Sequence, residues 1–286
     1  MRVEAGGVKV FICISVYDMR NRNFTLPGTI KDMFLLTSLL SFLVACSGDF
    51  KSVKYIGLKG KVKLVTDTVY SIGFTHFDSE IRSISLFEMD SSGYCFRESQ
   101  YNKDGELATS IETSYTGNGM IARTRVEYHG EREDWMKPSD YCLVKEEKDQ
   151  WTYVTTSGGE EWTDVKTWDG WMRCMITITE PAAGNQEQTS GELRSFYDRD
   201  GNMIEEWQEM YARDTLLVHQ VTRYQYDRNG DVVKAVKIYQ GQTYQDTITT
   251  ECFYSEYDDH GNWRTRATKD NSRSGYIVKR FILYAD

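Results

Sequence analysis

The stretch that decides the fold is Tyr197-Asp-Arg-Asp-Gly201-Asn, which returns as Tyr226-Asp-Arg-Asn-Gly230-Asp and as Tyr257-Asp-Asp-His-Gly261-Asn. The three copies are spaced by 29 and 31 residues, and a fixed spacing of this size is typical of an internal repeat. An Asp or Asn side chain accepts hydrogen bonds from the backbone that follows it, and glycine takes the left-handed conformation that ends a type I turn. Each copy therefore predicts a hairpin turn that begins just after a strand-ending tyrosine.

Working outward from these turns, a strand follows each of them. The runs Met203 to Tyr211, Val232 to Tyr239 and Trp263 to Thr268 are rich in β-branched and aromatic residues. Earlier copies of the turn are Tyr101-Asn-Lys-Asp-Gly105-Glu and Phe87-Glu-Met-Asp90-Ser-Ser-Gly93. One period of the repeat thus predicts two antiparallel strands, and successive periods predict a long meander.

The repeat resembles the YD-repeat, or Rhs-type, family, whose hallmark is Tyr-Asp-x-x-Gly-Asn followed by a β-rich stretch. The chain is most similar to short YD-repeat lipoproteins of Gram-negative bacteria. Leu58 to Tyr70 and Phe281 to Tyr284 also resemble the first and last strands of such domains. Large Rhs proteins build a shell around a toxin, but this chain is far too short for a shell, so the resemblance implies only the strand pairing.

We therefore expect the all-β class: an antiparallel β-meander of YD-type hairpin repeats that forms a single twisted or rolled domain over residues 55–286. Helical periodicity is almost missing from the mature sequence. The charged and turn-rich segment 129–140, which contains Pro138, is the expected position of a break between two halves.

The N-terminal region predicts export and a lipid anchor. Residues 33–46 form an uncharged run that is too short to span a membrane but fits the apolar region of a signal peptide. Leu43-Val44-Ala45-Cys46 resembles the lipobox of bacterial lipoproteins, which implies cleavage before Cys46 and lipid on its thiol. We interpret residues 1–45 as an over-extended start plus signal peptide, with Met19 as the expected start, and residues 46–54 as a tether. The alternative is a buried core helix.

Composition limits the partners. The chain has 286 residues and a formal net charge of −9, with 34 Lys and Arg against 43 Asp and Glu. An acidic chain without a basic block does not suit phosphate recognition, so we expect no nucleic acid partner. The expected partners are a membrane, contacted through the N-terminal lipid, and a glycan or an envelope protein.

The sequence predicts no catalytic residue, no metal site and no cofactor. Nucleotide-binding loops and nucleophile elbows are missing, and the four histidines do not have the spacing of metal ligands. The segment from Asp198 to Glu209 resembles a calcium loop, but its sixth position is Met203 rather than glycine, so a hairpin turn is favoured. The mature cysteines Cys95, Cys142, Cys174 and Cys252 lie in strand-like runs, which favours free thiols over disulfides.

The candidate binding residues are Trp162, Trp168 and Trp171 with Asp164 and Asp169. Proteins hold sugars with an aromatic ring against the apolar face of the pyranose and with carboxylates on its hydroxyls, and Trp162 and Trp168 share one strand face. Core packing is the alternative for these rings. The predicted function is a non-catalytic binding module, lipid-anchored in the Gram-negative envelope, for a glycan or an envelope protein. The alternative is a structural or immunity-type repeat protein whose sheet is itself the interface.

Overall fold

The computed structural model describes residues 58–71, 80–132, 136–182, 189–212, 215–241, 245–271 and 275–285. The predicted signal peptide, Cys46 and the tether lie outside the described residues. No helix in these ranges is long and apolar enough to cross a membrane.

The described residues form sixteen strands and one 3-10 helix. Their bounds are β1 (Val62–Ser71), β2 (Ile81–Met89), β3 (Cys95–Asn102), β4 (Leu107–Tyr115), β5 (Ile121–Tyr128), η1 (Gly130–Arg132), β6 (Ser139–Glu146), β7 (Gln150–Ser157), β8 (Glu160–Asp169), β9 (Cys174–Pro181), β10 (Thr189–Tyr197), β11 (Met203–Ala212), β12 (Thr215–Tyr226), β13 (Val232–Gly241), β14 (Gln245–Tyr257), β15 (Trp263–Asp270) and β16 (Gly275–Tyr284). The expected strands after the three turns are present as β11, β13 and β15.

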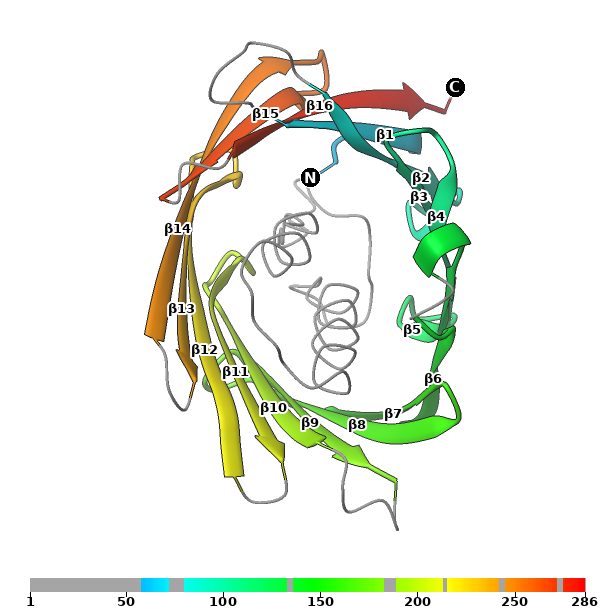
Figure 1. Cartoon of the computed structure of the whole chain (residues 1–286), viewed down its shortest axis with the longest axis vertical. Coiled ribbons are helices and arrows are strands. Elements are labelled where there is room, and N and C mark those ends of the chain that lie inside the picture. Colours follow the sequence, from blue (N-terminus) through cyan, green and yellow to red (C-terminus); the bar gives the residue numbers. More distant parts are fainter. Residues whose placement is uncertain are drawn as a thin grey trace.

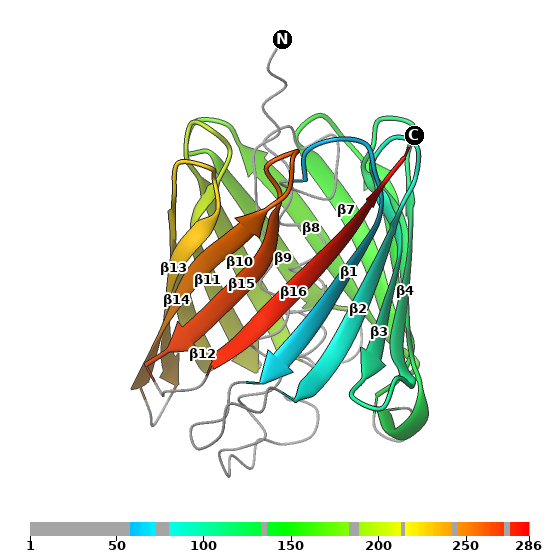
Figure 2. The ribbon, with the colours of Figure 1, turned by 90° about the horizontal axis from the view of Figure 1, so that it is seen from above.

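Each strand pairs antiparallel with the next one, and β16 pairs with β1, so the sheet closes into a barrel. Figure 1 shows the ring along its axis, with β1 and β16 on one wall and β7 and β8 on the opposite wall. Figure 2 shows the strands tilted across the side of the barrel, as closure of a sheet requires.

This closure corrects the predicted fold class. The all-β class is right, but the twisted or rolled meander of YD-type repeats is wrong, and with it the YD-repeat or Rhs-type assignment, because the strands form one closed sixteen-strand barrel. The turn sequences specify only neighbouring hairpins. Pairing of the first strand with the last joins residues more than 200 positions apart, and no local motif encodes it.

The turns themselves have the expected geometry. Asp227 Oδ1 accepts hydrogen bonds from the backbone N–H of Asn229 and of Asp231, both at 2.8 Å, and Gly230 N–H donates to Asp227 O at 3.1 Å. Gly230 has a φ of +78°, the left-handed conformation that ends the turn. The same side-chain pattern recurs at Asp90, Asn102, Asp198 and Asp258. The segment with calcium-like spacing is therefore a hairpin turn at Asp198.

Side chains alternate between the two faces of the barrel. On β1 the buried positions are Val65, Asp67 and Val69, whereas Thr66 and Thr68 between them are partly exposed. The register carries this alternation from strand to strand, and Val278 on β16 lies opposite Val69. The buried set on these strands is therefore the inward set.

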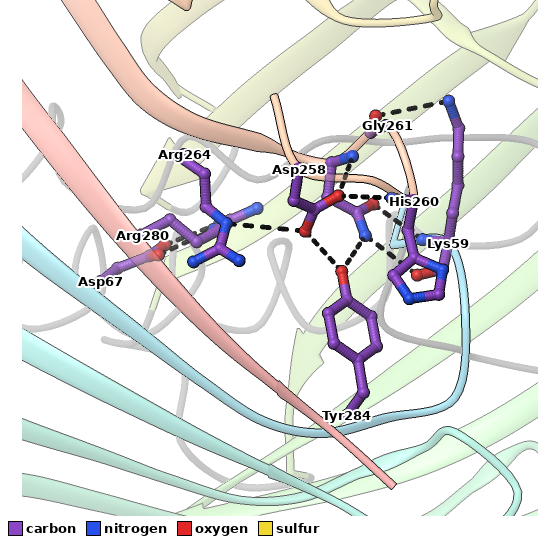
Figure 3. Close-up of polar contacts among 9 residues, drawn as sticks. Lys59, Asp67, Asp258, His260, Gly261, Arg264, Arg280 and Tyr284 are labelled. Carbon is purple, nitrogen blue, oxygen red and sulfur yellow. Dashed lines mark hydrogen bonds and ion pairs between the residues drawn. The ribbon is translucent and has the colours of Figure 1, made fainter. Parts of the chain in front are cut away.

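An ion pair and a rim cluster join the first and last strands (Figure 3). On the inner face, Arg280 Nε and Nη2 donate to the two carboxylate oxygens of Asp67 at 2.7 and 2.6 Å. At the rim, Asn262 Nδ2 donates to Lys59 O at 2.9 Å and to Tyr284 Oη at 2.7 Å, while Lys59 N–H donates to Asn262 Oδ1 at 2.8 Å. One amide side chain thus joins the segment before β1, the β14–β15 turn and the end of β16.

We predict that Arg280→Met lowers the free energy of unfolding by about 3 kcal/mol, because it leaves the carboxylate of Asp67 buried without its partner. The two side chains are only 10% and 13% exposed. Urea unfolding followed by tryptophan fluorescence measures the change. The matched control is Arg123→Met, which breaks a pair with Asp140 on the outer face and should cost less than about 1 kcal/mol. Equal losses in both variants would contradict a special role for the inner pair.

We predict that Gly230→Ala destabilises the protein by about 1 kcal/mol, because a Cβ is disfavoured at its left-handed φ. The added methyl group meets no atom within 4 Å, so the backbone conformation alone is tested. Gly117→Ala is the control, since that glycine lies in open space without a positive φ and should change stability by less than about 0.5 kcal/mol. Thermal unfolding of the two variants compares them directly.

Candidate functional site

Strand β8 brings several predicted site residues to the inner face of the barrel. Its buried positions Trp162, Asp164 and Lys166 alternate with the less buried Thr163 and Val165. Successive side chains of a β-strand point to opposite faces, so these three alternate residues lie on the same face. The strand lies on the wall opposite the pairing of β1 with β16 (Figure 1).

Asp164 is buried, with 6% of its surface exposed, and its two oxygens are each bonded to a threonine. Thr155 Oγ1 on β7 donates to Oδ2 at 3.2 Å, and Thr179 Oγ1 on β9 donates to Oδ1 at 2.5 Å. Charge-assisted hydrogen bonds of this kind hold a carboxylate in one orientation. Asp164 is therefore fixed between its neighbouring strands.

Lys166 is equally buried and lies over two tyrosine rings. Its Nζ is 5.3 Å from the ring centroid of Tyr141 on β6 and 5.2 Å from that of Tyr153 on β7, and the rings are stacked with centroids 4.3 Å apart. Ring faces attract a cation, and more strongly when water is excluded. Burial lowers the pKa of the Lys166 ammonium to about 7, although the nearby Asp164 carboxylate acts in the opposite direction.

Three polar atoms around these residues are buried and have no hydrogen-bond partner: Tyr141 Oη, Trp151 Nε1 and Trp162 Nε1. The register places Thr155 between Tyr141 and Trp162, and sets Trp151 opposite Lys166. We call Tyr141, Trp151, Tyr153, Trp162, Asp164 and Lys166 the inner patch. A buried donor without an acceptor costs about 1–3 kcal/mol, so the patch is suited to a molecule that supplies acceptors.

The structure separates the remaining predicted residues. Trp168 is partly buried at the end of β8, with its ring edge-on to Tyr197 at 6.1 Å between centroids. Asp169 caps the β8–β9 turn by accepting from the backbone N–H of Trp171 at 2.9 Å and of Met172 at 3.1 Å. The Trp171 side chain on that turn is 95% exposed. The inner face of β8 thus carries Trp162, Asp164 and Trp168, and Trp171 stands apart from them.

Sequence reasoning missed Lys166, Tyr141 and Tyr153 as site residues. The alternation along β8 would have found Lys166, since it shares the face of Trp162 and Asp164. The two tyrosines come from other strands and depend on the register of β6 with β7 and of β7 with β8. That register follows from turn lengths and a bulge between Leu143 and Lys145, which the sequence pattern does not reveal.

The described cysteines are all free: Cys95, Cys142, Cys174 and Cys252. Burial raises the pKa of the thiols of Cys174 and Cys252 to about 11. Since the thiolate is the reactive form, both thiols are inert at neutral pH. Among the described residues no group of three or more His, Cys, Asp or Glu side chains could hold a metal ion.

Comparison with known proteins gives structural likeness alone. No family model matches the chain, and no curated protein matches it. Among solved structures, a porin-like protein from Bacteroides vulgatus is similar, with a TM-score of 0.43 and 9% sequence identity over 80% of this chain and 99% of that chain. A likeness of this extent transfers no function.

Lys166 gives a testable pH dependence of stability. Its pKa is about 7 in the folded state and about 10.4 in an unfolded chain, so between these values the unfolded state binds more protons. The free energy of unfolding should therefore rise with pH from about 7 to about 10, by up to about 1.4 kcal/mol per pH unit from this group. Lys166→Met should remove that contribution, as measured by urea unfolding across the pH range; an unchanged slope would contradict it.

Glu98 on the inner face of β3 predicts the opposite slope at lower pH. Burial raises the pKa of its carboxyl to about 7, and the hydrogen bond from Gln100 Nε2, at 2.8 Å, only partly offsets this. The folded state then binds more protons between pH about 4.3 and about 7, so its contribution to stability is lost as pH rises through that window. In the same unfolding series, Glu98→Gln should reduce the fall of the free energy of unfolding with rising pH. Glu112→Gln on the exposed outer face should leave that fall unchanged.

Proposed function

We propose that the chain is a non-catalytic binding barrel of the Gram-negative cell envelope, held to a membrane by lipid on Cys46, and that it takes a glycan on its inner wall. The observation that carries the proposal is the contrast between the two faces of the barrel. The inner face combines polar and aromatic groups with buried aliphatic side chains, and the outer face bears ion pairs.

The outer face supports contact with water. Neighbouring outward side chains form ion pairs between strands, with Arg97 Nη2 at 3.0 Å from Glu112 Oε1 and Arg123 Nη2 at 2.7 Å from Asp140 Oδ1. On another side of the barrel, Arg223 pairs with Glu205. An arginine on a lipid-facing strand costs about 2–4 kcal/mol at the bilayer midplane. Several outward arginines together support a position of the outer face outside the hydrocarbon of the membrane.

The inner face supports ligand binding. Its buried polar positions carry mostly hydroxyl and amide groups: Ser85, Thr109, Thr113, Thr124, Ser139, Thr155, Ser195, Gln208, Gln220, Thr222, Thr250 and Thr268. Eight strands make a barrel that side chains can fill, whereas about sixteen leave an interior space. Hydroxyls, amides and aromatic rings together suit the hydroxyls and the apolar ring face of a sugar.

A transmembrane channel is the second candidate, and one observation favours it. Outward apolar side chains cross β14 and β16, where Phe253 is 57% exposed, Phe281 56% and Leu283 42%. Lys279 interrupts this strip on the same outward face of β16. Exposed apolar side chains also occur on other walls, with Ile178 on β9, Trp207 on β11 and Leu216 on β12. The outward arginines of β3, β5 and β12 stand against a continuous apolar band, which a channel needs around the whole barrel.

We predict that Cys46→Ala releases the protein from membranes as a folded barrel that stays in solution without detergent. Removal of the lipid leaves only the outer face, whose ion pairs favour water. Fractionation of cells, followed by far-UV circular dichroism of the soluble protein, is the measurement. A variant that remains in the membrane after alkaline carbonate extraction would contradict the proposal and support the channel.

We predict that the soluble full chain binds members of a glycan array and that Trp162→Phe weakens binding at least tenfold. Phenylalanine keeps a ring in the inner patch but removes the N–H of Trp162. Trp207→Phe is the matched control, since that indole lies on the outer face beside Phe196. Failure of the wild-type chain to bind any glycan, with a protein partner recovered by pull-down from the envelope, would overturn the proposal in favour of an interaction protein.

A further inference from the structure

The inner patch has more hydrogen-bond donors than acceptors. Tyr141 Oη, Trp151 Nε1 and Trp162 Nε1 are buried without partners, and an indole nitrogen can only donate. The carboxylate of Asp164 accepts from Thr155 and Thr179 and is not bonded to any of these three atoms. The patch therefore needs a hydrogen-bond acceptor, and the described residues do not supply one.

Lys166 adds a cation to the same place. In the part of the chain that the structure describes, its ammonium contacts the rings of Tyr141 and Tyr153 and forms no ion pair. Other inward cations also have a carboxylate close by. Arg280 is bonded to Asp67, and Lys237 acts electrostatically on Glu206 across the β11–β13 wall. Lys166 also has a carboxylate nearby, that of Asp164, but among the described residues it forms no hydrogen bond or ion pair with it.

We infer that the inner patch binds the carboxylate of an acidic sugar, with Lys166 as the cation and the indole N–H groups of Trp151 and Trp162 as further donors. This inference rests on the proposed glycan-binding function and names the class of glycan. A carboxylate carries one negative charge and can accept hydrogen bonds from several donors. It therefore complements the cation and the unpartnered donors of the patch.

The groups that face Lys166 give the binding a proton signature. Tyr141 on β6, Tyr153 on β7 and Asp164 on β8 are the titratable inward groups, while the inward positions Thr177 and Thr179 on β9 do not titrate. Burial raises the pKa of both tyrosines, so neither loses its proton at neutral pH. A bound carboxylate would raise the pKa of Lys166 from about 7, so binding at pH 8 should take up close to one proton.

The test compares trigalacturonic acid with its methyl ester, which keeps the sugar and removes the charge. Isothermal titration of the full chain should give at least tenfold tighter binding of the acid. Lys166→Met should reduce the affinity for the acid to that for the ester, and Lys237→Met on another inner wall should leave it unchanged. Titration of the acid at pH 8 in two buffers of different ionisation enthalpy should report proton uptake in the wild type and none in Lys166→Met.

Two results would overturn the inference, and they are distinguishable. If the acid and the ester bind equally and Lys166→Met changes neither affinity, the carboxylate site is wrong while a glycan-binding barrel stands. If neither sugar binds and an array of acidic and neutral glycans gives no ligand, the proposed function fails and the inference fails with it. Circular dichroism of Lys166→Met confirms its fold, and methionine suits this buried position because it fills the space without a charge.

Discussion

Pairing of β1 with β16 is the constraint on which the rest of the barrel depends. An open sheet of the same strands would leave two edges with unpaired N–H and C=O groups, and exposed edges promote aggregation. Closure removes both edges and places Asp67 opposite Arg280, so an ion pair forms where two ends of the chain meet. Asn262 secures the same junction at the rim.

Closure also decides what each face contains. Because side chains alternate along every strand, the inward set must match from β1 around the ring to β16, and a shift of one residue in any pair would turn a whole strand over. The bulges at the hairpin turns, such as the one between Gln225 and Tyr226, are part of that match. The result is an inner face with buried polar groups and an outer face with solvent-exposed ion pairs. Three buried donors without partners, on Tyr141, Trp151 and Trp162, then lie on the neighbouring strands β6, β7 and β8, which is the basis of the proposed ligand site.

Local features of this fold could be predicted from the sequence, and long-range ones could not. The turn at Asp227 and the strand that begins at Val232 follow from residues a few positions apart, and both are present. Closure depends on contacts between Val69 and Val278, which no repeat or turn signals. At the site, Trp162 and Asp164 were predicted from a cluster of tryptophans with neighbouring carboxylates. Tyr141 was missed because a bulge in β6 sets its position over Lys166.

The junction of the first and last strands has a consequence for the order of the chain. The N–H of Ala285 donates to the carbonyl of Lys61 at 2.8 Å, so the two ends of the strand set lie side by side. A short linker between them would make the backbone continuous around the ring. New termini could then be opened at another hairpin, such as the one at Asp198, without loss of any strand pairing. Circular permutation can therefore move the termini to another hairpin of the barrel. The same change moves the point at which a fused domain or a surface tether is attached.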